Sequence, residues 1–143
     1  MYDSILVATD GSDDATTAAD HAVGLARRLE VPLYGIAVIE SRIEYDNAIV
    51  DPAEIDRRRR ERTDSSLSKL EKAADDVGVT VETTVRSGVP HEEILEYADD
   101  CDAGAIVVGS RGRSSFRRAL LGSTVDAVVR LAVRPVIVIE SED

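Results

Sequence analysis

The sequence predicts an α/β fold: a single doubly wound, Rossmann-like sheet of five parallel strands with helices on both faces. Short apolar runs alternate with helical patterns along all 143 residues. The runs are continuously apolar, which is typical of strands covered on both faces. Hydrophobic residues make up 43% of the chain but aromatic residues only 3%, so the core must consist of Val, Ile, Leu and Ala. This length fits one domain, residues 1–143.

The chain begins with a strand, a helix and a second strand. The apolar run from Tyr2 to Thr9 predicts the first strand. Ser12 is a suitable N-cap, and the alanine-rich stripe that follows it predicts a helix as far as Leu29. Pro32 ends that pattern, and Leu33–Ile39 forms the second predicted strand.

The rest of the chain continues the alternation. Residues 41–52 have no clear period and indicate a connection. Gly78 follows a long helical pattern and Pro90 opens a short one, which marks a helix end and a helix start. The expected elements are a helix from Ala53 to Val77, a strand from Val79 to Val85, a helix from Pro90 to Tyr97, a strand from Ala105 to Val108, a helix from Ser123 to about Ala132 and a strand from Val136 to Ile139.

This alternation implies right-handed crossovers between parallel strands, and we expect the five strands in the order 3-2-1-4-5. The first crossovers run one way from strand 1 and the later ones run the other way, so a switch point separates strands 1 and 4. Ligands bind beyond the carboxyl ends of the strands at such a point. Because Asp10 follows strand 1 and Gly109 follows strand 4, we expect both at one crevice.

The most specific motif joins the fourth strand to the last helix. Gly109-Ser110-Arg111-Gly112 is followed by nine residues and then by Gly122-Ser123-Thr124. A strand that ends in glycine-rich turns and restarts as a helix leaves backbone amides that can bind an anion. No Gly-Lys-Ser/Thr sequence closes the loop, so the motif is not that of a P-loop hydrolase. The alternative is that the glycines only mark tight turns.

With these motifs the chain resembles the universal stress protein family, and its glycine spacing resembles the ATP-binding branch of that family. The resemblance covers essentially all 143 residues. The motifs that carry it are Val7-Ala-Thr-Asp10-Gly-Ser12, Gly35-Ile-Ala-Val38-Ile-Glu40, Gly88-Val-Pro90-His-Glu-Glu-Ile94, the glycine spacing itself and Arg134-Pro135-Val-Ile-Val-Ile139.

The resemblance implies an ATP site. Asp10 would accept hydrogen bonds from the ribose or adenine, although it is also a typical cap or turn residue, and Val38 would present backbone groups to adenine. Mg²⁺ would be held mainly by phosphates and water, and no catalytic or metal-ligating residue is expected. The residues expected to bind ATP are Ala8, Thr9, Asp10, Val38, Val108, Gly109, Ser110, Arg111, Gly112, Arg113, Gly122, Ser123 and Thr124.

Composition restricts the classes of partner and the location. A net charge of −11 and a pI near 4.6 argue against nucleic-acid binding. Arginine greatly outnumbers lysine and aspartate is abundant, which suggests adaptation to concentrated salt. No stretch is apolar enough to cross a membrane and no signal peptide begins the chain, so we expect a cytoplasmic protein without a membrane partner.

The last predicted strand suggests how the chain assembles. Val136, Ile137, Val138 and Ile139 would lie at the sheet edge, where an exposed apolar strand can pair with another chain, and the resemblance implies a homodimer through it. The expected function is that of a dimeric, ATP-dependent regulatory protein in the stress response, a binding protein with at most slow hydrolysis. A nucleotide-free interaction or chaperone-like module is the alternative. A phospho-receiver, with Asp10, Asp13 and Asp14 as its acidic pocket, is more remote.

Overall fold

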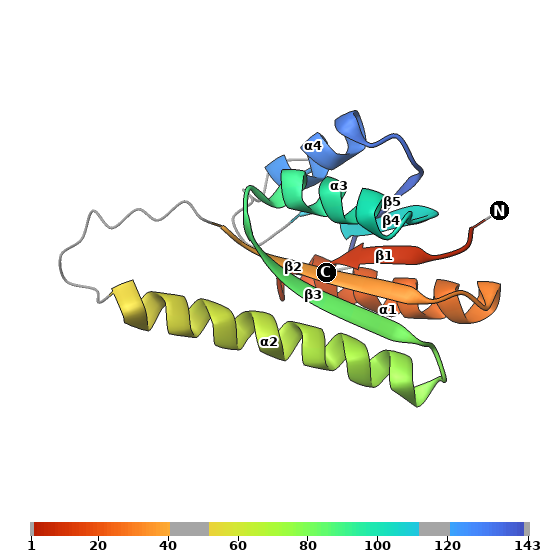
Figure 1. Cartoon of the computed structure of the whole chain (residues 1–143), viewed down its shortest axis with the longest axis horizontal. Coiled ribbons are helices and arrows are strands. Elements are labelled where there is room, and N and C mark those ends of the chain that lie inside the picture. The colour runs from red at the N-terminus through yellow and green to blue at the C-terminus, as the bar shows by residue number, and fades with distance from the viewer. Residues whose placement is uncertain (1, 41–51, 112–120, 142–143) are drawn as a thin grey trace.

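The computed structural model describes residues 2–40, 52–111 and 121–141. Five parallel strands form one sheet in the order β3-β2-β1-β4-β5, as the sequence predicts. Helices α1 and α2 cover one face of the sheet, and α3 and α4 cover the other (Figure 1). The elements are β1 (Ile5–Ala8), α1 (Asp13–Leu29), β2 (Leu33–Glu40), α2 (Pro52–Asp76), β3 (Val81–Gly88), α3 (Pro90–Asp100), β4 (Ala105–Gly109), α4 (Ser123–Leu131) and β5 (Val136–Ile139).

The sheet separates two apolar cores. Successive side chains of a strand point to opposite faces. Ile5 and Val7 therefore pack with the alanine stripe of α1 and with Leu70 of α2, whereas Leu6 packs with Ile94 of α3 and with α4. β1 and β4 lie in the middle of the sheet and are the most completely buried strands, which explains their uninterrupted apolar sequence.

Helix ends explain where the predicted boundaries are wrong. At the end of α2 the amide of Val79 donates to the carbonyl of Ala74 at 2.9 Å, and that of Gly78 donates to Asp75 at 3.1 Å. This is a Schellman motif with Gly78 in the left-handed region at φ 76°. Val79 thus closes the helix and packs in the core, so β3 begins only at Val81 and not at Val79 as predicted.

The other ends of these elements also differ from the prediction. The first strand is shorter than Tyr2–Thr9, and β3 extends beyond Val85 to Gly88. α3 continues past Tyr97 to Asp100 and also ends in a Schellman motif, in which Ala103 donates to Ala98. The connection expected over residues 41–52 falls, up to residue 51, outside the described part of the chain.

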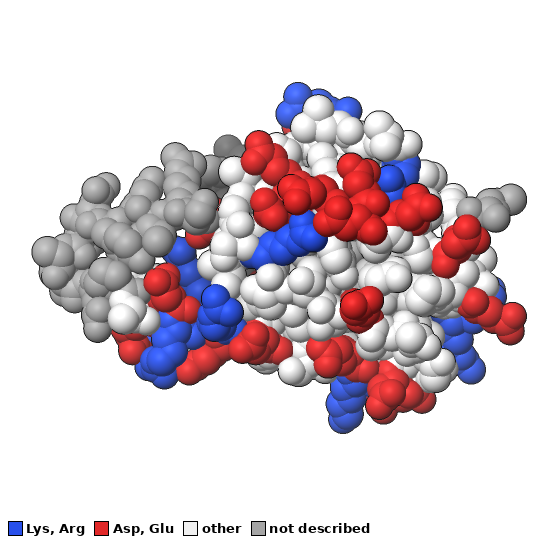
Figure 2. Space-filling model, viewed as in Figure 1, with Lys and Arg blue, Asp and Glu red and all other residues white. Residues whose placement is uncertain are grey.

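Acidic side chains gather over α3 on the face shown in Figure 2, around a few basic ones. Arg86 of β3 pairs with Asp100 at 2.7 Å and lies over the ring of Tyr97, 4.9 Å from its centroid. In the described part of the chain, no helix combines the length and the apolar character that a membrane span requires. On the face shown in Figure 2, the excess of acidic residues in the composition is most evident over α3.

Candidate functional site

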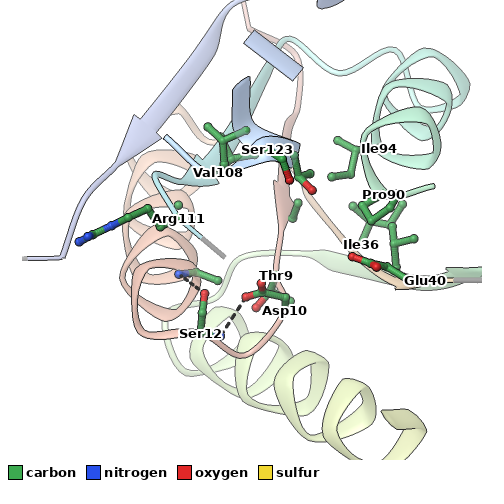
Figure 3. A pocket seen from close by; sticks show the side chains of 17 residues that line it. Thr9, Asp10, Ser12, Ile36, Glu40, Pro90, Ile94, Val108, Arg111 and Ser123 are labelled. Atoms are coloured by element: carbon green, nitrogen blue, oxygen red, sulfur yellow. Dashed lines mark hydrogen bonds between the residues drawn. The ribbon is translucent and has the colours of Figure 1, made fainter. Parts of the chain in front are cut away.

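A crevice opens at the carboxyl ends of β1 and β4, at the switch point of the sheet (Figure 3). The space between its walls, counted together with the solvent at its open mouth, is about 710 Å³. Among the residues predicted to bind ATP, those that line it are Ala8, Thr9, Asp10, Val38, Val108, Gly109, Arg111, Gly122, Ser123 and Thr124. Ser110 is buried beside the crevice, and Gly112 and Arg113 lie outside the described residues.

One wall of the crevice is apolar. Ile36 of β2 and Pro90 and Ile94 of α3 lie together on this side (Figure 3). Pro90 opens α3 and Ile94 follows one turn later, so both come to the same side of the helix. These three residues were not predicted as site residues. The Pro90–Ile94 helix entry was noticed in the sequence, but nothing in it indicates that the first turn of α3 faces the ligand crevice.

The edge of β2 is open toward the crevice beyond residue 36. β1 ends at Ala8, which pairs with Ile36, whereas β2 continues to Glu40. The carbonyl of Ile36 accepts from the amide of Thr9, so even-numbered residues of β2 direct their backbone groups toward β1. Val38 is also even-numbered, so its backbone groups point to the same side, but β1 ends at Ala8 and does not reach Val38. Its N–H and C=O therefore face the crevice, and a backbone role for Val38 is geometrically available.

Asp10 forms the turn between β1 and α1. Its Oδ1 accepts from the amide of Ser12 at 2.9 Å, and Gly11 between them has φ 80°. Ser12 in turn caps α1 by accepting from the amide of Ala15 at 3.2 Å. The turn role left open in the sequence is thus present. Because the Asp10 carboxylate also lines the crevice, turn and ligand roles are compatible.

The amino end of α4 faces the crevice without a side-chain cap. Gly122 is its N-cap and offers no side chain, and the amide of Asp126 makes the first bond back to the Gly122 carbonyl, at 2.9 Å. The amides of Ser123, Thr124 and Val125 therefore have no acceptor within the helix. All three residues line the crevice. Aligned, uncapped amides at a positive helix end form a ready anion site.

Other amides near this corner are already used. The amide of Ser110 donates to the carbonyl of Ile139 at 2.8 Å, continuing the pairing of β4 with β5. The amide of Gly122 donates to the carbonyl of Ser110, also at 2.8 Å. Backbone donation from Ser110 and Gly122 thus holds the fold together, and at this corner the described amides that face the crevice without a partner in the helix are those of the first turn of α4.

Asp14, which the sequence suggested only as part of a phospho-receiver pocket, lies at the junction of α1, β4 and the end of β5. Its side chain is buried at the start of α1, and its Oδ2 accepts from the Ser110 hydroxyl at 2.6 Å and from the Arg111 amide at 3.2 Å. Its Oδ1 accepts from both the amide and the hydroxyl of Ser141. Burial raises the pKa of Asp14, but the hydrogen bonds from Ser110 and Ser141 and the charge of Arg111 outweigh it and lower the pKa to about 2.

This arrangement removes the acidic pocket that a phospho-receiver needs. Asp14 faces Ser110 and Ser141, whereas Asp13 is exposed and Asp10 holds its turn. Within residues 2–40, 52–111 and 121–141, no group of three or more His, Cys, Asp and Glu side chains could hold a metal ion.

Gly109 is a glycine because α1 lies directly against it. A Cβ at this position would come within 2.6 Å of the carbonyl carbon of Asp14 and 2.8 Å of the amide nitrogen of Ala15. Both atoms are backbone, so a side chain could not simply rotate out of the way. The sequence assigned this glycine to the anion-binding motif, whereas the described neighbours of its missing side chain belong to α1.

Arg111 is held at the rim. Its Nε lies 3.6 Å from Asp14 Oδ2 and its Nη2 lies 3.9 Å from Glu140 Oε1. In Figure 3 its side chain extends away from the apolar wall. The guanidinium therefore belongs to a charge network with α1 and the end of β5, and the contact with ATP expected for Arg111 would require its side chain to turn.

Comparison with known proteins gives a consistent result. The sequence profile described as "Universal stress protein family" matches residues 1–140. The chain is 34% identical to the universal stress protein MJ0531 of Methanocaldococcus jannaschii, over 98% of this chain and 83% of that protein. It is 35% identical to YxiE of Bacillus subtilis, over 97% of this chain and 99% of that protein.

Solved structures share the fold over nearly the whole chain. The structure of MJ0577, also from M. jannaschii, superposes with a TM-score of 0.85 at 29% identity, covering 100% of this chain and 99% of that one. An Archaeoglobus fulgidus universal stress protein in complex with dAMP gives 0.71 at 27% identity, covering 96% and 98%. A universal stress protein in complex with cAMP gives 0.74 at 26% identity, covering 96% and 97%. The chain therefore belongs to the universal stress protein family.

Proposed function

We propose that residues 1–143 form one nucleotide-binding domain that takes up ATP in the crevice and acts as a regulatory protein of the stress response. The observation that carries this proposal is the pairing of an apolar wall, around Ile36 and Ile94, with the uncapped amino end of α4 in the same crevice. The apolar wall suits a flat nucleotide base, and the amino end of α4 suits a polyphosphate. The cAMP and dAMP complexes of family members support an adenine nucleotide.

The polar residues of the crevice fit the rest of the nucleotide. The backbone edge of β2 at Val38 can donate to and accept from the rim of adenine, because β1 no longer covers it. The carboxylates of Asp10 and Glu40 line the crevice and can accept hydrogen bonds from ribose hydroxyls. Neither carboxylate suits a phosphate contact, since like charges repel.

A divalent ion would accompany the triphosphate. The described residues provide no cluster of three ligands for it, so Mg²⁺ would be coordinated mainly by phosphate oxygens and water. Its charge would reduce the repulsion between the polyphosphate and the nearby carboxylates of Asp10 and Glu40.

We expect hydrolysis to be slow. Efficient phosphoryl transfer needs a group that orients the attacking water and a cation that neutralises the charge of the transition state. Arg111 is the arginine among the described lining residues, and its guanidinium is engaged by Asp14 and Glu140. ATP would then act as a bound signal more than as a substrate.

Assembly and setting complete the proposal. β5 lies at the edge of the sheet, and its Val138 side chain is exposed. An apolar edge strand can pair with a second copy, so we propose a homodimer through β5. A cytoplasmic location and adaptation to high salt remain predictions from composition.

A charge placed at the amino end of α4 tests the site directly. We expect Ser123→Glu to weaken ATP binding at least about tenfold, because a carboxylate occupies the anion position, while the melting temperature stays equal or rises slightly. Val129→Glu adds the same charge to the exposed side of α4, outside the crevice, and should change affinity less than about twofold. Isothermal titration calorimetry with ATP, ADP and AMP, each with Mg²⁺ at high salt, measures both effects.

The outcomes separate the candidate functions. Unchanged affinity in Ser123→Glu would show that the phosphates do not lie at α4. No binding of any adenine nucleotide by the wild-type chain would favour the interaction or chaperone-like alternative. Affinity that rises from AMP to ATP would support polyphosphate recognition.

A further inference from the structure

A single buried carboxylate joins the phosphate end of the crevice to the end of β5. Asp14 is 6% exposed and does not line the crevice, so it is not itself placed to contact a nucleotide. Its two oxygens bind two different segments. Oδ2 accepts from Ser110 and Arg111, just after β4, and Oδ1 accepts from Ser141, just after β5.

The hydrogen bonds continue from this carboxylate to the α4 amides. The Ser110 hydroxyl donates to Asp14 at 2.6 Å, and the Ser110 carbonyl accepts from the amide of Gly122 at 2.8 Å. Gly122 is the N-cap of α4, so the position of Ser110 sets the position of the first helical turn. The amide of Ser110 also donates to Ile139, the last residue of β5. Ser110 is thus bonded to α1, to β5 and to the cap of α4.

The Asp14 carboxylate is fully used in this role. Ionised, it offers about four acceptor positions, and two donors reach each of its oxygens. Hydrogen bonds to a charged acceptor are about twice as strong as neutral ones, and a buried one holds its partners in narrow positions. The close approach of α1 to Gly109 places the carboxylate at this junction.

We propose that Asp14 is a positioning residue for nucleotide binding: it fixes Ser110, and through Ser110 the phosphate-facing turn of α4, and it couples that turn to the chain segment that follows β5. This inference rests on the proposed function. Nucleotide binding at α4 should then slow the opening of the Ser141 segment. Loosening Asp14 should weaken binding from a position outside the crevice.

The full-length chain and three variants test the proposal. Asp14→Asn keeps the shape but replaces one acceptor oxygen with a donor, which then faces donors from Ser110 and Arg111 or from Ser141. Asp13→Asn is the matched control, because Asp13 is the neighbouring exposed carboxylate in the same helical turn. Ser141→Ala removes one donor to Asp14 from outside the crevice.

Calorimetry with Mg-ATP and hydrogen exchange of individual amides give the readouts. We expect Asp14→Asn to lower ATP affinity at least about tenfold at a temperature where it is folded, Ser141→Ala about threefold, and Asp13→Asn less than about twofold. ATP should slow exchange of the Ser141 amide in the wild type and not in Asp14→Asn. A purely structural role would change the melting temperature and leave the affinity of the folded variants unaltered.

Failure of this proposal and failure of the ATP site can be told apart. Wild-type affinity and an intact Ser141 response in folded Asp14→Asn would overturn the positioning role. If Asp14→Asn does not fold, ATP affinity equal to that of the wild type in Ser141→Ala would also overturn the positioning role. If the wild type binds no nucleotide, the proposed function fails. Hydrogen exchange of the Arg111 and Ser141 amides, measured without nucleotide, then tests whether Asp14 holds these two segments in place. Exchange at least about tenfold faster in Asp14→Asn than in Asp13→Asn supports this positioning role, and equal rates contradict it.

Discussion

Gly109→Ala distinguishes two explanations for the glycine that ends β4. The added Cβ would lie 2.6 Å from the Asp14 carbonyl carbon and 2.8 Å from the Ala15 nitrogen and the Asp14 carbonyl oxygen. Favourable contacts between carbon atoms are about 3.5–4.0 Å, so α1 must move away from β4 by about 1 Å. Overpacking of this kind costs about 1–3 kcal/mol. The same shift lengthens the hydrogen bonds from Ser110 and Arg111 to Asp14, and each such bond to a charged group contributes about 1.5–3 kcal/mol.

We therefore expect Gly109→Ala to lower the free energy of unfolding by about 3 kcal/mol and the melting temperature by about 10 °C. Urea unfolding and calorimetric melting measure this without nucleotide, so the result does not depend on the proposed function. Gly24→Ala is the matched control: nothing lies within 4 Å of a Cβ at this exposed position in α1, and the variant should gain about 0.5–1 kcal/mol. Wild-type stability in Gly109→Ala, with nucleotide binding lost, would refute the packing explanation and favour a ligand requirement.

Four further predictions concern stability and assembly. The pKa of Asp14 is lowered from 3.8 to about 2, so its contribution of about 2 kcal/mol should be complete above pH 4 and fall away as the pH drops toward 2; urea midpoints of Asp14→Asn should lack this dependence. Glu30→Gly should raise stability by about 0.5–1 kcal/mol in thermal unfolding, because Glu30 ends α1 at φ 57°. Melting temperature should rise steeply between dilute and molar salt, and a flat profile would contradict the high-salt hypothesis. Val138→Lys should convert the proposed dimer into a monomer in light scattering, and a wild-type monomer at micromolar concentration would contradict β5 pairing.

The sequence predicts the fold because its periodicity is consistent along the whole chain. The strands other than β3 are apolar runs and the helices between them have apolar stripes, so the alternation of parallel strands and crossover helices is evident in the sequence. The boundaries were less accurate for a physical reason. Val79 looks like the start of a strand, but a Schellman motif uses it to close α2. Only the backbone geometry distinguishes an apolar residue that closes a helix from one that begins a strand.

The candidate site was predicted at its polar end and missed at its apolar end. Asp10, Gly122 and Ser123 are conspicuous because turns and helix starts have chemical signatures in sequence. Pro90 and Ile94 have a local explanation as a helix start and a core residue, and only the packing of α3 beside the open edge of β2 brings them to the crevice. The amides of Ser110 and Gly122 show the converse. Sequence assigned them to a ligand, whereas the strand pairing and the α4 cap use them.

Asp13 and Asp14 show most directly what sequence cannot distinguish. Both are carboxylates in the first turn of α1, where either would interact favourably with the helix dipole. Successive helical residues point about 100° apart, so one of the two faces solvent and the other faces the end of β4. What makes the inward position tolerable for a charge is remote in sequence: hydroxyls at Ser110 and Ser141 and a missing side chain at Gly109. A methyl group at 109 would displace the carboxylate from these donors, and an apolar side chain at 14 would leave the donors without their acceptor. The glycine at 109, the carboxylate at 14 and the two serine hydroxyls thus depend on one another. Replacing either Gly109 or Asp14 should therefore speed amide exchange both in the first turn of α4 and at the end of β5.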